Sequence, residues 1–145
     1  MLKAQLKVLN EGLMTALIEI TTQGSTAILT MNTAENRHNP TFIIEFNQHL
    51  DTIEANEHIK AVVLTSSSDK SWSLGIDLQW MANPDNTPQI IADFMNSIGA
   101  LFKRIVTFPM PIIAALNGHT YGNGSVLACA CDFRFMKSDK GFFCF

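Results

Sequence analysis

Hydrophobic and polar residues alternate in two short stretches near the start of the chain. The stretches TALIEITT (15–22) and STAILTM (25–31) both show this two-residue period and are rich in β-branched residues. Between them lie Gln23 and Gly24, and glycine readily adopts the backbone angles of a tight turn. The pattern predicts a β-hairpin of two antiparallel strands.

A three- to four-residue spacing of apolar side chains marks two later segments. Each begins with an N-cap residue followed by proline at the first helical position, Asn39-Pro40 in one and Thr87-Pro88 in the other. The first helix is predicted to run to about Asn56. The apolar faces consist of Ile43, Phe46, Leu50 and Ile53 in the first helix, and of Ile90, Ile91, Phe94, Met95, Ile98, Leu101, Phe102 and Ile105 in the second.

Continuous apolar runs indicate the remaining elements. KAVVLTS (60–66) and PIIAAL (111–116) are typical of strands buried on both faces. GSVLACAC (124–131) predicts a short buried helix, and DFRFM (132–136) a strand after it. Strands thus alternate with helices after the hairpin, which favours a layered α/β fold with parallel pairing.

Composition narrows the class of protein. The chain has 145 residues, of which 47% are hydrophobic, and a net charge of -3, as expected for one globular domain with its own core. Without a basic stripe, a nucleic-acid partner is not expected. No segment reaches the roughly 18 apolar residues of a membrane span. The opening segment does not resemble a signal peptide, because Asn10 and Glu11 interrupt its apolar residues. Three cysteines, an odd number, indicate a reducing, cytoplasmic setting, and Cys129 and Cys131 in their apolar run are expected to be free, buried thiols.

Two glycine-containing turns are the candidates for chemistry, and each follows a predicted buried strand. They are SLGID (73–77) and GHTYGNG (118–124), and free N–H groups point outward where a helix begins at Gly124. If parallel strands bring the turns together, their N–H groups converge as an oxyanion hole, which stabilises an oxygen that gains negative charge. Spacing alone leaves open that both glycines only tighten turns. The four histidines show no metal-ligand spacing, so each is expected to be solvated or to serve packing, and no metal site is predicted.

The stretches WSLGIDL (72–78) and PIIAALNGHTYGNGSVLACACDFRF (111–135) resemble two patterns of the crotonase superfamily of enoyl-CoA hydratases and isomerases. The patterns are roughly F-S-x-G-x-D-L and P-x-I-A-A-x-N-G-x-A-x-G-G-G-x-x-L-A-x-x-C-D-x-R. The resemblance implies a spiral of ββα turns, truncated here before the C-terminal helical part. Residues 14–145 would form an incomplete crotonase-like core, and residues 1–13 an N-terminal extension. It also implies a homo-oligomer, a trimer or hexamer, in the full-length form.

The resemblance further implies an acyl-CoA thioester as substrate, with CoA as part of the substrate and no other cofactor. The carbonyl oxygen would accept two backbone N–H bonds, from Ile76 and Asn123, while an enolate is stabilised. In the loop NRHNP, Arg37 or His38 would meet a phosphate of CoA, with a solvated charge as the alternative. Asp77 would mainly hold its loop. The substrate-binding positions implied are Arg37, His38, Ser73, Gly75, Ile76, Asp77, Leu78, Tyr121, Gly122, Asn123 and Val126.

Two departures from the family pattern shape the predicted function. Asn123 stands at the middle glycine of the G-G-G triplet, and Val126 stands where hydratases carry a glutamate. Water addition needs two carboxylates, so the sequence favours an enoyl-CoA isomerase of fatty acid metabolism, whose acid is implied at or just past Phe145. The alternative is a non-catalytic acyl-CoA-binding or assembly module. Three apolar side chains, Phe142, Phe143 and Phe145, would leave an exposed patch if nothing covers them.

Overall fold

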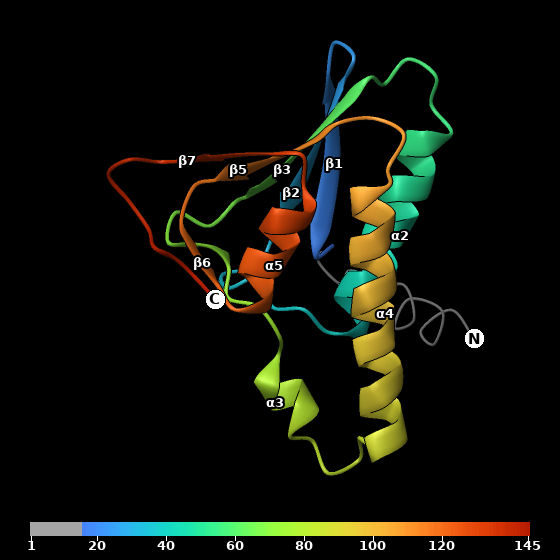
Figure 1. Ribbon diagram of the computed structural model, residues 1–145, viewed down its shortest axis with the longest axis vertical. Helices are drawn as coiled ribbons and strands as arrows, with labels where there is room; N and C mark the ends of the chain where they lie inside the picture. Colours follow the sequence, from blue (N-terminus) through green and yellow to red (C-terminus); the bar gives the residue numbers. More distant parts are fainter. Residues whose placement is uncertain (1–15) are drawn as a thin grey trace, which may run out of the picture.

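The strands form two sheets in the computed structural model, which describes residues 16–145 (Figure 1). In spatial order, the larger sheet contains β1 (Ile18–Gln23), β2 (Thr26–Met31), β3 (Ala61–Ser66), β5 (Ile112–Leu116) and β7 (Phe133–Met136). The smaller sheet contains β4 (Ser71–Ser73), β6 (His119–Tyr121) and β8 (Phe143–Cys144). The predicted α/β class is confirmed. The expected extension, residues 1–13, lies outside the described residues.

The predicted hairpin and the parallel strands are both present. β1 and β2 pair antiparallel from Ile18 opposite Met31 to Gln23 opposite Thr26, and Gly24 has a φ of +58° in the turn. β2 and β3, β3 and β5, and β5 and β7 pair in parallel. Each parallel pair is joined by a connection that contains at least one helix, as parallel strands require.

Capping residues begin the two long helices where the sequence predicts. α2 (Pro40–Glu54) starts at Asn39, whose side chain accepts from Phe42 N at 3.0 Å. α4 (Pro88–Val106) starts at Thr87, whose hydroxyl accepts from Ile90 N at 3.3 Å. Within residues 16–145 there are also two shorter helices, α3 (Leu78–Met81) and α5 (Asn123–Ala130).

Burial in the central strands alternates, so the prediction that they are buried on both faces is wrong. In β3, Val62 and Leu64 are buried whereas Val63 is half-buried, and β5 alternates in the same way. The cause is that α2 and α4 lie against each other along one flank of the larger sheet (Figure 1). One face of the sheet therefore packs into the core, together with the buried side of α4, formed by Phe94, Ile98, Leu101 and Ile105.

The smaller sheet was not predicted because its strands are only two or three residues long. It ties the last residues of the described chain to the start of α5. Thr120 N donates to Phe142 O, and Gly122 N donates to Cys144 O, each at 2.9 Å. The Ser125 hydroxyl lies 2.8 Å from Thr120 O and 2.7 Å from Cys144 O. These bonds fix the position at which α5 begins.

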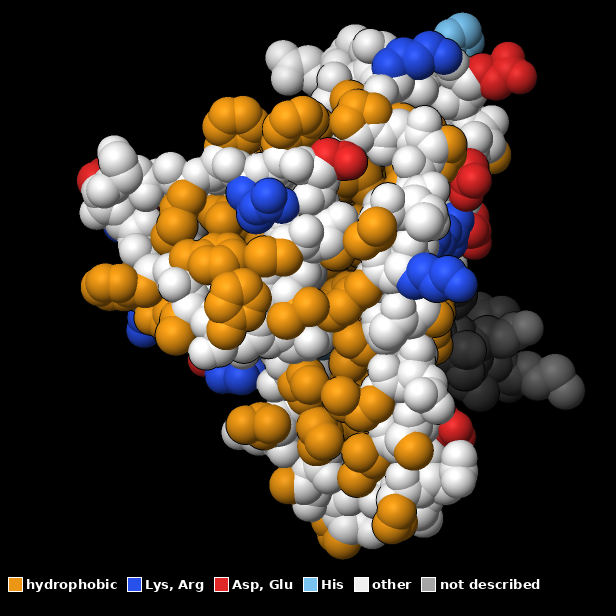
Figure 2. Space-filling model, viewed as in Figure 1, with side chains coloured by type: hydrophobic (Ala, Val, Ile, Leu, Met, Phe, Trp, Pro, Cys, Tyr) orange, Lys and Arg blue, Asp and Glu red, His pale blue; other side chains and the backbone are white. Residues whose placement is uncertain are grey.

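Apolar side chains remain exposed on the surface around this sheet. Phe142 and Phe145 are 70% and 76% exposed, and Phe133 and Phe135 of β7 are 56% and 68% exposed. Figure 2 shows hydrophobic side chains gathered over the region of β6 and α5 and down between α3 and α4. The exposed apolar area therefore extends well beyond the final segment for which the sequence predicted it.

The three cysteines are free. Cys131 is buried as expected, but Cys129 is exposed, so the expectation of a buried thiol is wrong for Cys129. Burial raises the pKa of the Cys131 thiol to about 12. Among the helices of residues 16–145, none has the length and apolarity to cross a membrane.

Candidate functional site

The carboxyl ends of β4 and β6 lie side by side in the smaller sheet. The two strands are parallel, with Ser71 opposite His119 and Ser73 opposite Thr120. Parallel neighbours end at the same edge of a sheet, so the segments that follow them begin next to each other. These segments are the two glycine-containing turns in which the sequence predicts backbone donors.

Gly75 allows the two turns to come into close contact. Its φ of +83° lies in the left-handed region that favours glycine. A Cβ atom at this position would lie only 2.9 Å from both the Asn123 nitrogen and the Tyr121 oxygen. Gly75 is thus needed both for the turn and for the approach of another backbone.

The N–H group of Ile76 points away from the chain segment beside it. Ile76 forms a parallel bridge with His38, in which His38 N donates to Gly75 O at 2.8 Å and Asp77 N donates to His38 O at 2.9 Å. In parallel pairing, the N–H and C=O groups of the bridging residue itself face the other side. The Ile76 carbonyl there accepts from Arg37 at 3.3 Å, whereas its N–H has no acceptor within residues 16–145.

The N–H group of Asn123 is the second free donor. Asn123 is the first residue of α5, and Gly122, with a φ of +52°, precedes it without a capping side chain. Ser125 N and Val126 N both donate to Gly122 O, but Asn123 N has no acceptor in the described part of the chain. Unpaired N–H groups and the positive end of the helix dipole coincide at such a position, which favours an oxygen that carries negative charge.

A buried hydrogen-bond network supports both turns. The Ser73 hydroxyl lies 2.8 Å from Asn36 O, 3.1 Å from His38 Nε2 and 3.2 Å from Gly75 N. On its other side, the His38 ring places Nδ1 at 2.9 Å from Asn123 Nδ2. The network therefore runs from the turn after β4 to the first residue of α5.

His38 does not meet the expectation that it contacts a phosphate. Its side chain is completely buried, and burial lowers the pKa of its imidazole from 6.5 to about 3. A neutral ring that is closed off from solvent and stacked on Phe42, with centroids 4.7 Å apart, offers nothing to an anion. No pattern in the sequence indicates its partners, which are Ser73 and Asn123.

Arg37 remains partly accessible, with its side chain 34% exposed. Its Nε donates to Glu35 at 2.8 Å, and its Nη1 lies 3.3 Å from both Leu74 O and Ile76 O. Arg37 borders a depression of about 390 Å³, lined by Glu35, Arg37, Asp77, Leu78 and Gln79. It therefore holds the carbonyl side of the Ile76 turn and still faces solvent.

Asp77 and Leu78 lie immediately after the first donor. The Asp77 carboxylate caps α3 by accepting from Trp80 N at 3.0 Å, and it also lies 3.3 Å from Asn39 Nδ2. This placement agrees with a loop-holding role for Asp77. Leu78 is 66% exposed, so its side chain lines only the outer rim of the depression.

Tyr121 and Val126 flank the second donor. Tyr121 is half-buried, and its hydroxyl lies 3.0 Å from His119 Nδ1. Val126 is 40% exposed and stands three residues after Asn123, on the same side of α5. An exposed apolar side chain thus lies about one helical turn from the free N–H group.

Asp132 and Arg134 hold the end of α5 and the start of β7. The Asp132 carboxylate accepts from Ile112 N at 2.8 Å, and Arg134 donates to Cys131 O at 2.7 Å. Both side chains are thus engaged by the backbone of neighbouring segments. Within residues 16–145, no group of three His, Cys, Asp or Glu side chains could hold a metal ion.

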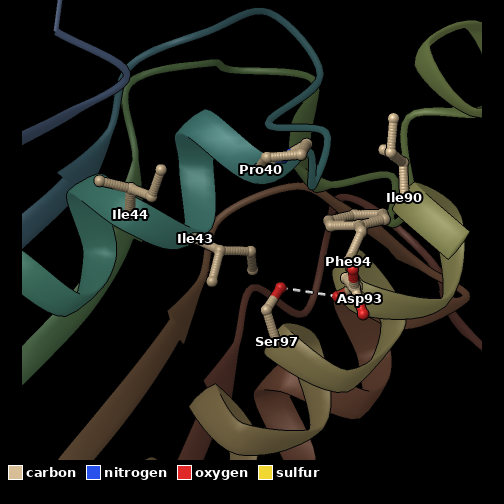
Figure 3. Close-up of a pocket in the computed structure, with 7 residues that line it drawn as sticks. All are labelled: Pro40, Ile43, Ile44, Ile90, Asp93, Phe94 and Ser97. Carbon is tan, nitrogen blue, oxygen red and sulfur yellow. Dashed lines mark hydrogen bonds between the residues drawn. The ribbon is translucent and has the colours of Figure 1, made fainter. Parts of the chain in front are cut away.

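A mostly apolar pocket of about 330 Å³ lies between α2 and α4, and no sequence pattern predicts it. Figure 3 shows its lining residues: Pro40, Ile43, Ile44, Ile90, Asp93, Phe94 and Ser97. Phe94 also packs edge-on against Trp80 of α3, with ring centroids 4.8 Å apart. Phe94 therefore lines the pocket and also contacts α3, the helix that follows the turn carrying Ile76.

Comparison with known proteins identifies the family of the chain. Residues 21–144 match the family described as Enoyl-CoA hydratase/isomerase. The chain belongs to this family. It is 31% identical to enoyl-CoA delta isomerase 2 (peroxisomal) of Arabidopsis thaliana, over 82% of the chain and 51% of that protein. It is also 31% identical to crotonyl-CoA hydratase of Syntrophomonas wolfei, over 75% of the chain and 41% of that protein.

A solved member of the enoyl-CoA hydratase/isomerase family has the same fold. The enoyl-CoA hydratase from Polaromonas sp. JS666 superimposes with a TM-score of 0.78 at 32% identity, over 85% of this chain and 49% of that one. This confirms the crotonase-like fold that the sequence implies. The chain spans about half the length of the relatives it matches. Since these relatives are named both as hydratases and as isomerases, membership of the family leaves the reaction to be assigned from the site.

Proposed function

We propose that the protein binds acyl-CoA thioesters and stabilises an enolate through the backbone N–H groups of Ile76 and Asn123. One observation carries the proposal: two donors without acceptors, on adjacent turns that are in backbone contact at Gly75. Fixed donors of this kind are most effective where negative charge develops on an oxygen. The positive end of α5 adds to the stabilisation at Asn123.

Among the reactions of this family, we propose a double-bond shift in an enoyl-CoA. Hydration needs two carboxylates, one to position water and one to protonate carbon. Val126 supplies none, and the Asp77 carboxylate already caps α3. Moving a double bond needs only one group that removes and returns a proton, and several relatives are named enoyl-CoA delta isomerases. CoA would be part of the substrate, and no cofactor would be required.

A second candidate is an acyl-CoA-binding module without catalysis. It is favoured by the same lack of a free carboxylate beside the amide pair in the described residues. The free cysteines support a reducing, cytoplasmic location for either function, and a homo-oligomer stays a prediction.

Binding should distinguish a thioester from CoA itself. Two neutral hydrogen bonds of roughly 1 kcal/mol each predict that butyryl-CoA binds about 30-fold more tightly than CoA. Isothermal titration calorimetry would measure both affinities. The matched control is the butyl thioether of CoA, which has the apolar tail but no carbonyl. Equal affinities for thioester and thioether would contradict the proposed oxyanion hole.

Turnover should show a double-bond shift without hydration. We expect a full-length form that carries the acid implied at or past Phe145 to isomerise a 3-enoyl-CoA and to hydrate a 2-enoyl-CoA at a negligible rate, because a positioned acid or base is worth about 10²–10⁴-fold in rate. Val126→Glu should raise hydration, and Val126→Gln, of the same size but without a carboxylate, should not. Hydration by the wild-type protein at an ordinary enzyme rate of about 1–10³ s⁻¹ would contradict this assignment.

A further inference from the structure

The side chain of Asn123 is held away from its own N–H group by a buried histidine. Asn123 provides the second proposed donor through its backbone, and its carboxamide Nδ2 lies 2.9 Å from His38 Nδ1. The two residues come from opposite ends of the described chain, His38 from the loop before α2 and Asn123 from the first position of α5. This hydrogen bond therefore joins the loop before α2 to the start of α5.

The hydrogen bonds around His38 assign its tautomer. The Ser73 hydroxyl lies 2.8 Å from the carbonyl oxygen of Asn36, so its proton must point there. Ser73 Oγ can then only accept from His38 Nε2 at 3.1 Å, which places the ring proton on Nε2. His38 Nδ1 is left as an acceptor, and the Asn123 Nδ2–H group donates to it.

Without this bond, an asparagine at the start of a helix would interfere with binding at the amide pair. Asparagine side chains readily accept hydrogen bonds from nearby backbone N–H groups, and the free ends of helices are where they do so. Rotation about the Cα–Cβ bond to another staggered position would carry the carboxamide oxygen toward the unpaired N–H groups of α5. It would then compete with a bound carbonyl oxygen for the same donors.

We propose that His38 is a positioning residue that anchors the Asn123 carboxamide, so that the N–H groups of Ile76 and Asn123 stay open to the thioester oxygen. This inference rests on the proposed function, since it gives His38 a part in acyl-CoA recognition. His38 itself is completely buried and touches no substrate. The Asn123 side chain, which would obstruct the two N–H groups if it rotated freely, is thereby kept clear of them.

The test is a double-mutant cycle read out by affinity for butyryl-CoA and for CoA. His38→Phe keeps a flat ring that can stack on Phe42 and removes both ring nitrogens. We expect it to weaken butyryl-CoA binding about tenfold and to leave CoA binding unchanged. In an Asn123→Gly background, the same change should alter butyryl-CoA affinity by less than twofold, because no carboxamide is left to anchor. An equal loss in both backgrounds would overturn the inference.

A spectroscopic measurement on the wild-type protein provides a second test that needs no variant. Nitrogen-15 NMR of the His38 ring should show Nε2 protonated and Nδ1 unprotonated at neutral pH. The side-chain amide protons of Asn123 should exchange with solvent more slowly than those of Asn96, which is exposed on α4. A proton on Nδ1, or equal exchange at the two asparagines, would overturn the inference even if His38→Phe fails to fold.

The same data separate this inference from the proposed function. If wild-type protein binds butyryl-CoA, its thioether analogue and CoA equally, the oxyanion hole is refuted. If it prefers the thioester but the cycle shows additive losses, only the anchoring role of His38 is refuted.

Discussion

Replacing Gly124 with alanine is expected to destabilise the protein by about 3 kcal/mol or more and to abolish thioester recognition. A Cβ atom at Gly124 would lie 2.5 Å from Ser73 O, 2.8 Å from Ser73 Oγ and 2.9 Å from Ser73 Cβ. These distances are far inside van der Waals contact, and one of the atoms belongs to the backbone of β4. Since Ser73 is completely buried, β4 and α5 would have to move apart. Urea denaturation monitored by circular dichroism would give the loss of stability.

Gly99 offers a matched control for this substitution. It lies within α4, is exposed, and has no atom within 4 Å of the place where a Cβ would stand. Gly99→Ala should therefore stabilise the protein by up to about 1 kcal/mol, the difference in helix propensity between the two residues. If Gly124→Ala left the urea midpoint unchanged or raised it as Gly99→Ala does, the close packing of α5 on β4 would be refuted.

Acidification should remove a large part of the stability through His38. Burial lowers the pKa of this imidazole to about 3 in the folded protein, against 6.5 for an ordinary histidine. Between these two values the unfolded chain binds a proton that the folded protein does not, so the free energy of unfolding falls as the pH falls. The contribution of His38 is fully present above about pH 6.5 and declines down to about pH 3. One proton changes the free energy by about 1.4 kcal/mol per pH unit, which gives a loss of about 2–3 kcal/mol between pH 6.5 and 4.5.

Urea titrations at several pH values in this range would measure the effect. Carboxylates contribute their own pH dependence, so the informative quantity is the difference between the wild-type protein and His38→Phe, which has no imidazole at this position. The wild-type curve should be steeper with pH. Parallel curves would show that His38 takes up its proton as easily in the folded protein as in the unfolded chain.

The elements that the sequence predicted well depend on neighbouring residues. Asn39 and Thr87 cap their helices through residues three positions later, and Gly24 closes a turn between adjacent strands. Such local preferences can be recognised from a few consecutive residues of the sequence. By contrast, β4, β6 and β8 are held by partners far away in the chain, and their few residues carry no periodicity of their own. For that reason the sequence predicts no strand at these positions.

The same distinction explains how much of the site could be predicted. Gly75 and Gly122 indicate backbone turns with positive φ. Together with the family resemblance, they allow the positions of the two donors to be predicted from the sequence. The environment of His38 could not be predicted, because an isolated histidine in a polar loop gives no sign that Ser73 and Asn123 will enclose it. The sequence allows a solvated or a packed side chain for this histidine, and the structure places it in the interior.

The dependence of the site on the smaller sheet has a consequence for biosynthesis. A nascent chain that has emerged as far as α4 already contains the β1–β2 hairpin, α2 and the parallel partner β3. The strand β4 has then also left the ribosome. The other two strands of its sheet, β6 and β8, are still unsynthesised or inside the ribosome. Pairing between distant segments requires the closure of long loops. The turn that carries Ile76 therefore cannot take up its final position until β6 is available to pair with β4. Ligand binding would therefore be acquired late during translation, after most of the larger sheet has formed.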